Sequence, residues 1–389
     1  MVVFASEWVR RFFLIPVVVA AGLCLPFGQS TLASQSTAAS AAQITQDSVL
    51  GHLEFLASDA LQGRGSGTRD EEIAATYIGA YFRRLGLEPM ADTGGFVQRI
   101  EVIRETASAP PTVAAGTRLG GVTGATPRVA RVTLDADTHA AMAALPSGTV
   151  VTIDAALTGT SSSTWNAMAR LTGADAAQRA EVIVLGAHLD HVGRRETATG
   201  EDKIFNGADD DASGTVAVME LAAAFAAGPR PKRTMVFALF GSEEAGGFGA
   251  GYFVDKPVVA HNAMIAQIQF EMLGRADSLV PTDHLWLTGY ERSNLGAELA
   301  KRGARVVQDP RPDQSFFTRS DNIRFARKGI VAHTVSSFNL HKDYHQVGDE
   351  VSKIDLAHMT RSIQSMLEPI RWLANSTFKP EWAPGGRPQ

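Results

Sequence analysis

Residues 182–185 read Val-Ile-Val-Leu, a continuous apolar stretch, and Gly-Ala-His follows it at 186–188. A run of this kind is typical of a strand that is buried on both faces of a sheet. Similar runs follow at 234–240 and 265–270, and an apolar stretch of helical length lies between the first two, at 215–227. Strands that alternate with helices predict an α/β fold, in which helices cover both faces of a central sheet.

Shorter segments extend this pattern toward both ends of the chain. They are two strands at 285–287 and 330–335 and three helices at 46–58, 68–86 and 354–373. The second of these helices is expected to start at a capping box formed by Thr68 and Glu71.

The composition is that of a globular protein. Of 389 residues, 45% are hydrophobic and 20% are charged. The net charge is −5, and a mildly acidic chain is a poor candidate for binding nucleic acid. Cys24 is the one cysteine in the sequence, which excludes an intramolecular disulfide and a zinc site built from cysteines.

The first 33 residues are predicted to be a secretory signal peptide. Arg10 and Arg11 precede an apolar stretch at 12–27, and residues 31–33 provide a small-residue cleavage site. We therefore expect an exported protein, periplasmic or secreted, with no membrane span after cleavage. An uncleaved N-terminal membrane anchor is the alternative, and the paired arginines loosely resemble a twin-arginine export signal.

The rest of the chain divides by composition. Residues 105–180 are rich in Ala, Thr, Gly and Pro, and we interpret them as a small insertion or lid. The other expected regions are a flexible lead-in at 34–44, an N-terminal helical part of the catalytic domain at 45–104, a metal-binding core at 181–375 and a flexible tail at 376–389.

Acids and imidazoles gather where the predicted strands end. Ligands of open α/β sheets bind at the carboxyl ends of the strands, so these residues are expected to share one site. They are His188 and Asp190 after the first strand, Asp209, Asp210 and Asp211 before the next helix, Glu243 and Glu244 after the second strand, Glu271 after the third, and His345 in a late polar loop. Each group alone has a simpler explanation, such as helix capping or a solvated loop. As a set, they suit two zinc ions that share a carboxylate.

The spacing within two of these groups has a chemical use. His188 and Asp190 point the same way in extended backbone, so the carboxylate can hold the imidazole in the tautomer that binds metal. Adjacent carboxylates such as Glu243 and Glu244 repel each other unless a cation lies between them. One of them can then bind metal while the other carries a proton.

The order of these motifs resembles that of the co-catalytic di-zinc exopeptidases, a family that includes secreted bacterial aminopeptidases, glutamate carboxypeptidase and the inactive transferrin receptor. The resemblance covers residues 48–374 and includes the segments 56–59, 63–65 and 75–78. It implies a mixed central sheet flanked by helices on both faces, the zinc-exopeptidase fold, with two zinc ions per chain.

The resemblance also implies a role for each site residue. The ligands it implies are His188, Asp210 and Glu271 for one zinc ion and Asp210, Glu244 and His345 for the other. Glu243 is then the general base, and Asp190 orients the first histidine. Asp321, in the motif Ser-Asp-Asn at 320–322, and Tyr344 are expected to line the substrate pocket.

Two features depart from the family pattern. Glu271 stands where the family usually has Asp, and its extra methylene is expected to displace that zinc ion or weaken its binding. Many secreted relatives also carry a protease-associated domain before the His-x-Asp strand. Residues 105–180 are too few for that domain and its connections, so a reduced remnant or a lid is expected there.

The expected function is that of an exported zinc exopeptidase acting on peptides, most simply an aminopeptidase that uses a two-metal-activated water with Glu243 as general base. A carboxypeptidase or a deacylase on the same scaffold is the first alternative, because nearby arginines could bind a free carboxylate. These arginines are Arg311, Arg319, Arg324 and Arg327. A catalytically inactive binding protein is the second alternative. Glutaminyl cyclisation by a single zinc ion is disfavoured, because both histidines of a two-metal site are present.

Overall fold

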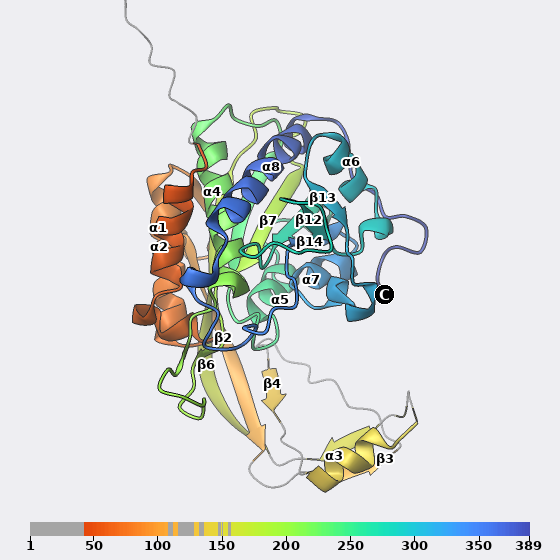
Figure 1. Cartoon of the computed structure of the whole chain (residues 1–389). Coiled ribbons are helices and arrows are strands. Elements are labelled where there is room, and N and C mark those ends of the chain that lie inside the picture. Colours follow the sequence, from red (N-terminus) through yellow and green to blue (C-terminus); the bar gives the residue numbers. More distant parts are fainter. Residues whose placement is uncertain are drawn as a thin grey trace, which may run out of the picture. The chain divides into compact units, whose positions relative to one another are not determined.

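The computed structural model describes residues 43–107, 112–115, 128–131, 136–146, 149, 151–154 and 157–389 (Figure 1). The predicted signal peptide and almost all of the predicted lead-in lie outside these residues. Within the described part of the chain, no helix is long and apolar enough to span a lipid bilayer.

The centre of the fold is a set of four parallel strands. They are β7 (Val182–His188), β10 (Thr234–Phe240), β11 (Met264–Phe270) and β14 (Ala332–Ser336), and they lie in the order β14-β11-β7-β10. Each pairs with its neighbour in parallel. All four therefore end at the same edge of the sheet, which brings the residues that follow them together.

Further strands extend this core on both sides and join it through antiparallel pairs, β12 with β14 and β6 with β10, so the sheet is mixed, as predicted. Among the described residues it has ten strands, in the order β13-β12-β14-β11-β7-β10-β6-β2-β4, with β1 beside β6. The added strands are β1 (Glu88–Pro89), β2 (Val97–Ala107), β4 (Arg128–Arg131), β6 (Leu157–Leu171), β12 (Leu285–Leu287) and β13 (Val306–Gln308). Two further pairs are β3 (Thr112–Ala115) with β5 (Val151–Asp154) and β8 (Gly193–Arg194) with β9 (Ile204–Phe205).

Helices cover both faces of the central strands (Figure 1). The described α-helices are α1 (Gln46–Leu56), α2 (Arg69–Arg84), α3 (Ala136–Ala143), α4 (Gly214–Ala227), α5 (Phe248–Asp255), α6 (Leu295–Lys301), α7 (Asn322–Arg327) and α8 (Leu356–Asn375). In β7, Ile183 and Leu185 pack into the core shared with α1, α2, α4 and α8, whereas Val182 and Val184 pack into the core shared with α5 and α7. Every residue of β7 is buried for this reason, and the continuous apolar run predicted it.

Helix α2 begins as predicted, but its capping acid has a different partner. The Thr68 side chain accepts hydrogen bonds from the backbone N–H groups of Asp70 and Glu71. The Glu71 carboxylate does not return to Thr68. It accepts a bond of 2.7 Å from the Gly67 N–H and one of 2.7 Å from the Thr164 hydroxyl on β6. Burial raises the pKa of Glu71 to about 8, and its bonds join the helix start to the sheet.

The predicted insertion at 105–180 is shorter in the structure. Strand β6 lies inside the main sheet, between β2 and β10, although the sequence prediction assigned its residues to the insertion. Residues 158–164 are small and mostly polar, so this segment lacks the alternation of apolar and polar side chains on which a strand prediction depends. The role of the remaining segment as a lid stays a prediction.

The predicted flexible tail at 376–389 is instead packed against the catalytic domain. The Trp382 indole N–H donates a hydrogen bond of 3.0 Å to the Gly329 carbonyl. Its ring lies 5.5 Å from that of His333 and 6.3 Å from that of Phe317, measured between centroids. Backbone contacts add to this packing, since the Ala383 N–H donates to the Arg292 carbonyl. Composition does not reveal such contacts.

A buried acid on α4 makes the stability of the fold depend on pH. Glu220 is 3% exposed; it accepts a hydrogen bond from the Ser48 hydroxyl and lies 3.6 Å from His52 Nε2. Burial raises the pKa of Glu220 to about 7. Burial, followed by the charge of Arg84, lowers the pKa of His52 to about 4, so His52 is neutral where Glu220 ionises and does not compensate its charge.

We predict that E220Q stabilises the protein at alkaline pH and not at acid pH. An unfolded glutamate ionises near pH 4.5, whereas folded Glu220 keeps its proton until about pH 7. The free energy of unfolding therefore falls as pH rises through this interval, and the loss persists above it. E220Q should raise that free energy by about 3 kcal/mol at pH 8 and hardly change it at pH 4.5. Urea unfolding at both pH values measures this, with E72Q on the exposed face of α2 as the control. Equal effects at the two pH values would contradict the prediction.

Candidate active site

The ends of the four parallel strands supply most of the predicted site residues. His188 is the last residue of β7, Glu243 and Glu244 follow β10, and Glu271 follows β11 directly. His345 lies in the loop after β14. The strand order brings these residues to one edge of the sheet, as expected from the alternation of strands and helices.

Four of the side chains at this edge form a set with the geometry of a metal site. His191, Asp210, Glu244 and His345 each offer one ligand atom, and these atoms lie within 4.8 Å of one another. His345 Nε2 is 3.1 Å from Asp210 Oδ2 and 3.0 Å from Glu244 Oε1. The set contains three of the predicted ligands and adds His191, which the sequence analysis did not single out. We call it the four-residue set.

Asp210 connects this set to His188. Its Oδ1 atom lies 3.2 Å from His188 Nε2, while its Oδ2 atom faces His345. The two oxygens of one carboxylate thus face different imidazoles. A carboxylate shared by two cations needs this arrangement, so the position of Asp210 agrees with the bridging role implied by the resemblance.

The two aspartates that flank Asp210 have structural partners. Asp211 accepts hydrogen bonds from the backbone N–H groups of His188, Gly214 and Met272. Asp209 accepts them from the Gly274 N–H and the Ser213 hydroxyl, and lies 3.0 Å from His341 Nε2. The three consecutive acids therefore divide into one that faces the site and two that hold the turn before α4.

Asp190 fixes the turn that carries the two glutamates. It is fully buried, and its Oδ1 and Oδ2 atoms accept hydrogen bonds from the backbone N–H groups of Glu243 (2.9 Å) and Glu244 (3.3 Å). The Ser66 hydroxyl also donates to Oδ2. His188 Nδ1 lies 3.6 Å from Oδ1 and 3.2 Å from the Asp190 carbonyl. Asp190 thus holds the turn of the general base candidate and lies beside His188; its role in orienting that histidine stays a prediction.

A buried arginine links the segments that carry the site. Arg64, in the Gly-Arg-Gly segment at 63–65, is 1% exposed. Its guanidinium donates hydrogen bonds to the backbone carbonyls of Leu56, Leu189, Asn206 and Gly207. It thereby ties the end of α1 to the loop after β7 and to the loop that leads to Asp210. The motif noted in the sequence is structural rather than catalytic.

Glu271 is near the four-residue set but does not belong to it. Its Oε2 atom is buried without a hydrogen-bond partner among the described residues, and burial raises the pKa of Glu271 to about 7. The carboxylate lines a cavity beside Tyr344. Its binding of an ion together with His188 and Asp210 stays a prediction.

Several acids share this edge of the sheet with Glu243. Burial, together with the charges of Asp321, Glu271 and Glu244, raises the pKa of Glu243 well above its ordinary value, against the opposing effect of His188. Burial also raises the pKa of Asp321 to about 7, and Glu271 adds to the effect. An unpaired set of buried carboxylates is costly, so the site favours a positively charged partner.

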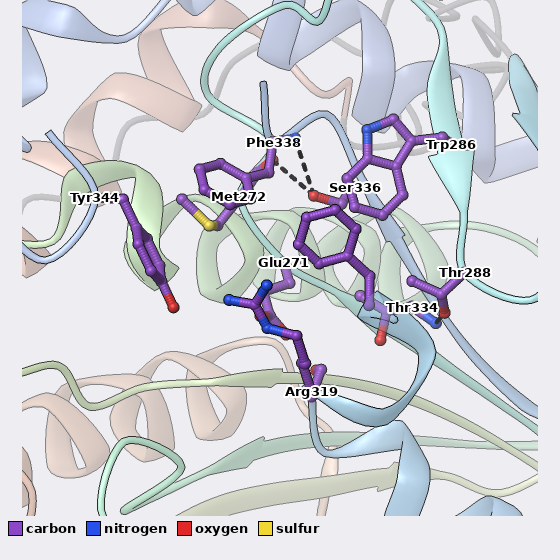
Figure 2. A pocket seen from close by; sticks show the side chains of 11 residues that line it. Glu271, Met272, Trp286, Thr288, Arg319, Thr334, Ser336, Phe338 and Tyr344 are labelled. Carbon is purple, nitrogen blue, oxygen red and sulfur yellow. Dashed lines mark hydrogen bonds between the residues drawn. The ribbon is translucent and has the colours of Figure 1, made fainter. Parts of the chain in front are cut away.

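A small cavity of about 30 Å³ adjoins Glu271 (Figure 2). Its lining is Glu271, Met272, Trp286, Thr288, Phe316, Arg319, Ser320, Thr334, Ser336, Phe338 and Tyr344. The walls are mainly aromatic: Trp286 stacks on Phe316, and Phe338 packs between Phe316 and Tyr344. Tyr344 lies in this lining, whereas Asp321 does not and only its neighbour Ser320 does; the contact of Tyr344 and Asp321 with substrate stays a prediction.

One of the four arginines noted in the sequence lines this cavity. Arg319 places its guanidinium 4.9 Å from the centre of the Phe316 ring. Arg311 instead forms an ion pair with Asp277 through both terminal nitrogens, and Arg324 donates to the Gly246 carbonyl. Arg327 is exposed at the end of α7.

The residues fit zinc. The donors are imidazoles and carboxylates, which zinc binds readily. Within the described residues, the buried atoms Glu244 Oε1, Glu271 Oε2 and both ring nitrogens of His191 have no hydrogen-bond partner. Buried polar atoms are almost always paired, and a cation bound at this edge of the sheet accounts for the two carboxylate oxygens and for Nδ1 of His191, which is the ring nitrogen that faces Glu244.

Fold and site together define a metal-dependent hydrolase of the α/β class. The comparisons with known proteins agree: residues 166–370 match the model of peptidase family M28. The match spans more than half of the chain, and the chain belongs to this family. It is a metallopeptidase, as its motifs indicated.

Solved structures share the fold at low sequence identity. The aminopeptidase from Aneurinibacillus sp. strain AM-1 aligns with a TM-score of 0.58 at 17% identity, over 86% of this chain and 95% of that chain. BSAP, a zinc aminopeptidase from Bacillus subtilis, aligns with a TM-score of 0.59 at 15% identity, over 88% and 98%. A Zn-dependent exopeptidase from Parabacteroides distasonis aligns with a TM-score of 0.54 at 12% identity, over 87% and 100%. These similarities confirm the predicted zinc-exopeptidase fold.

We predict that D190N lowers turnover while the protein stays folded. In D190N, an NH₂ group replaces one carboxylate oxygen and faces the N–H and O–H groups that donate to Asp190, so donor meets donor. The turn that carries Glu243 and the ring of His188 are then held less firmly. The expected loss in kcat is about 10- to 100-fold, typical of a partner that orients a metal ligand, with a smaller change in KM. D355N is the control, since it makes the same exchange at the cap of α8. Full turnover in D190N would show that Asp190 does not position the site.

Proposed function

We propose that this protein is a zinc aminopeptidase, which removes N-terminal residues from peptides. The observation that carries the proposal is the four-residue set beside Glu243, with the two oxygens of Asp210 facing two different groups of imidazoles. His188, Asp210 and Glu271 would hold one zinc ion. Asp210, Glu244 and His345 would hold the other.

When bound, the two ions supply Lewis acidity that activates water and polarises the peptide carbonyl. The protein's own residues do the rest. Glu243 accepts the proton of the attacking water and passes it to the leaving amine, since it is a carboxylate next to the ligand Glu244. Asp190 holds the backbone of this turn through the Glu243 and Glu244 N–H groups, so the base stays aligned.

The acids of the site support an amino-terminal specificity. A peptide's α-ammonium group is a cation, and the buried carboxylates of Glu271 and Asp321 are suited to bind it. The first side chain of the peptide would then lie at the mouth of the cavity next to Glu271, because a volume of about 30 Å³ cannot hold a whole side chain. The aromatic walls formed by Trp286, Phe316 and Phe338 favour an apolar side chain there.

We predict that E243Q loses activity but keeps its zinc. Glutamine cannot accept the proton of the attacking water, so kcat should fall by about 10³-fold. Zinc content by mass spectrometry and the far-UV spectrum should match the wild type. E244Q is the matched contrast, because Glu244 is a proposed zinc ligand. This substitution should lower the zinc content together with turnover. If E243Q keeps near-normal turnover, another residue is the base.

A carboxypeptidase is the second candidate, and Arg319 is the observation that favours it. Its guanidinium lines the cavity and is suited to bind a free carboxylate. The two functions differ in which end of the peptide must be charged.

We predict that dipeptides with a free N-terminus and an amidated C-terminus are hydrolysed, whereas N-acetylated dipeptides with a free C-terminus are not. Removing the α-ammonium should cost at least about 100-fold in kcat/KM, since it leaves buried acids unpaired. A chelator should abolish the activity and zinc should restore it. Hydrolysis of the N-acetylated dipeptides instead, with this activity lost in R319A, would identify a carboxypeptidase. A protein that binds no stoichiometric zinc would be a binding protein.

We further propose that the protein acts after export, in the periplasm or outside the cell. The apolar segment at 12–27 behind Arg10 and Arg11 supports this, and the single cysteine, Cys24, lies within that segment.

A further inference from the structure

His191 has the surroundings of a metal ligand rather than of an ordinary buried histidine. Its side chain is fully buried, and within the described residues neither ring nitrogen has a hydrogen-bond partner. A buried polar atom without a partner costs about 1–3 kcal/mol. Nδ1 nevertheless lies only 3.0 Å from Glu244 Oε1 and 3.7 Å from Asp210 Oδ2.

The short contact with Glu244 lacks the geometry of a hydrogen bond. Glu244 Oε1 is itself buried without a hydrogen-bond partner, although it is 3.0 Å from both His191 Nδ1 and His345 Nε2. Atoms that approach each other this closely without hydrogen-bond geometry are expected where all of them point at a common third atom. A cation between them satisfies every one of these atoms at once.

The distances agree with one zinc ion at the centre of the four-residue set. Ligand atoms about 2.0–2.1 Å from a tetrahedral zinc ion are about 3.4 Å from each other. The four separations within the set that involve one histidine and one carboxylate are 3.0, 3.0, 3.1 and 3.7 Å. The rings of His191 and His345 are 5.6 Å apart and nearly perpendicular, so both can direct a nitrogen to the same point.

The chain around His191 is built to hold the ring in place. The His191 N–H donates to the Arg64 carbonyl, and its own carbonyl accepts from the Ser66 N–H. Gly207 makes room on the other side, because a Cβ atom there would lie 2.5 Å from two ring carbons. The ring position is therefore fixed by the backbone on one side and by a glycine on the other.

We propose that His191 is a fourth protein ligand of the ion that Asp210, Glu244 and His345 hold, so that the two metal positions of this enzyme are unequal. This inference rests on the proposed function, which supplies the two ions. The position at the four-residue set has four protein ligands, as structural zinc sites do. The position at His188, Asp210 and Glu271 has three, which leaves room for water or substrate. The first position should bind zinc more tightly than the second.

The first test measures zinc affinity. Wild type, H191L and H333L are equilibrated in zinc buffers of graded free concentration, and zinc per chain is measured by mass spectrometry. Wild type should lose its two ions in two separate steps. H191L should shift the tighter step to a free zinc concentration about 100-fold higher. This is the upper end of the loss of affinity expected when a residue that only orients a metal ligand is replaced. H333L is the matched control, because His333 is equally buried but bonds to Ser293 and Thr288 instead.

The second test does not need a folded variant. Wild-type protein loaded with one equivalent of zinc is examined by X-ray absorption, which counts imidazole ligands. We expect about two per zinc ion, from His191 and His345. A count of one, or an H191L protein with the affinities of wild type, would overturn the role of His191 and leave the proposed function standing. A wild-type protein that binds no zinc would overturn the proposed function itself.

Discussion

The site depends on the position of one carboxylate, that of Asp210. One of its oxygens faces His188 and the other faces His345 and His191, so a small rotation of this group would separate the two halves of the site. The backbone limits that rotation. The N–H groups of Asp209 and Asp210 both donate to Asp349, which in turn pairs with Arg275.

A second constraint comes from the sign of the charges. Asp321 and Glu271 lie close enough to Glu243 to raise its pKa, and Glu271 also raises the pKa of Asp321, in addition to the effect of burial. Folding alone gains nothing from crowding acids in this way. The arrangement is favourable only when cations share the site, and both of the cations proposed here, zinc and a peptide α-ammonium, are of that kind.

The sequence was sufficient to predict the strands that are buried on both faces of the sheet. Strand β10 occupies 234–240, as predicted from its apolar run. Strand β7 begins at Val182, as predicted, but continues to His188, beyond the predicted end at residue 186. The convergence of their ends followed from the general topology of α/β sheets. Strand β6 was not predicted, because it is rich in Ser and Thr and lacks an apolar pattern. Its place in the sheet comes from its pairing with β2 and β10.

His191 shows where reasoning from strand periodicity stops. In extended backbone, His191 would point away from His188 and Asp190, which lie on the other side of the alternation. The chain leaves the strand at this point and pairs with Gly65, so alternation no longer governs the direction of the side chain. The second imidazole in Gly-Ala-His-Leu-Asp-His is visible in the sequence, but only the tertiary contacts with Glu244 and Asp210 give it a meaning.

The docking of the last residues onto the catalytic domain links one end of the chain to substrate choice. Trp382 packs on Phe317 and His333, and the immediate neighbours of these two residues, Phe316 and Thr334, form part of the cavity wall. Changes far along the chain, such as trimming or fusion near Trp382, can therefore reshape the selectivity of the pocket without touching any residue that meets the substrate.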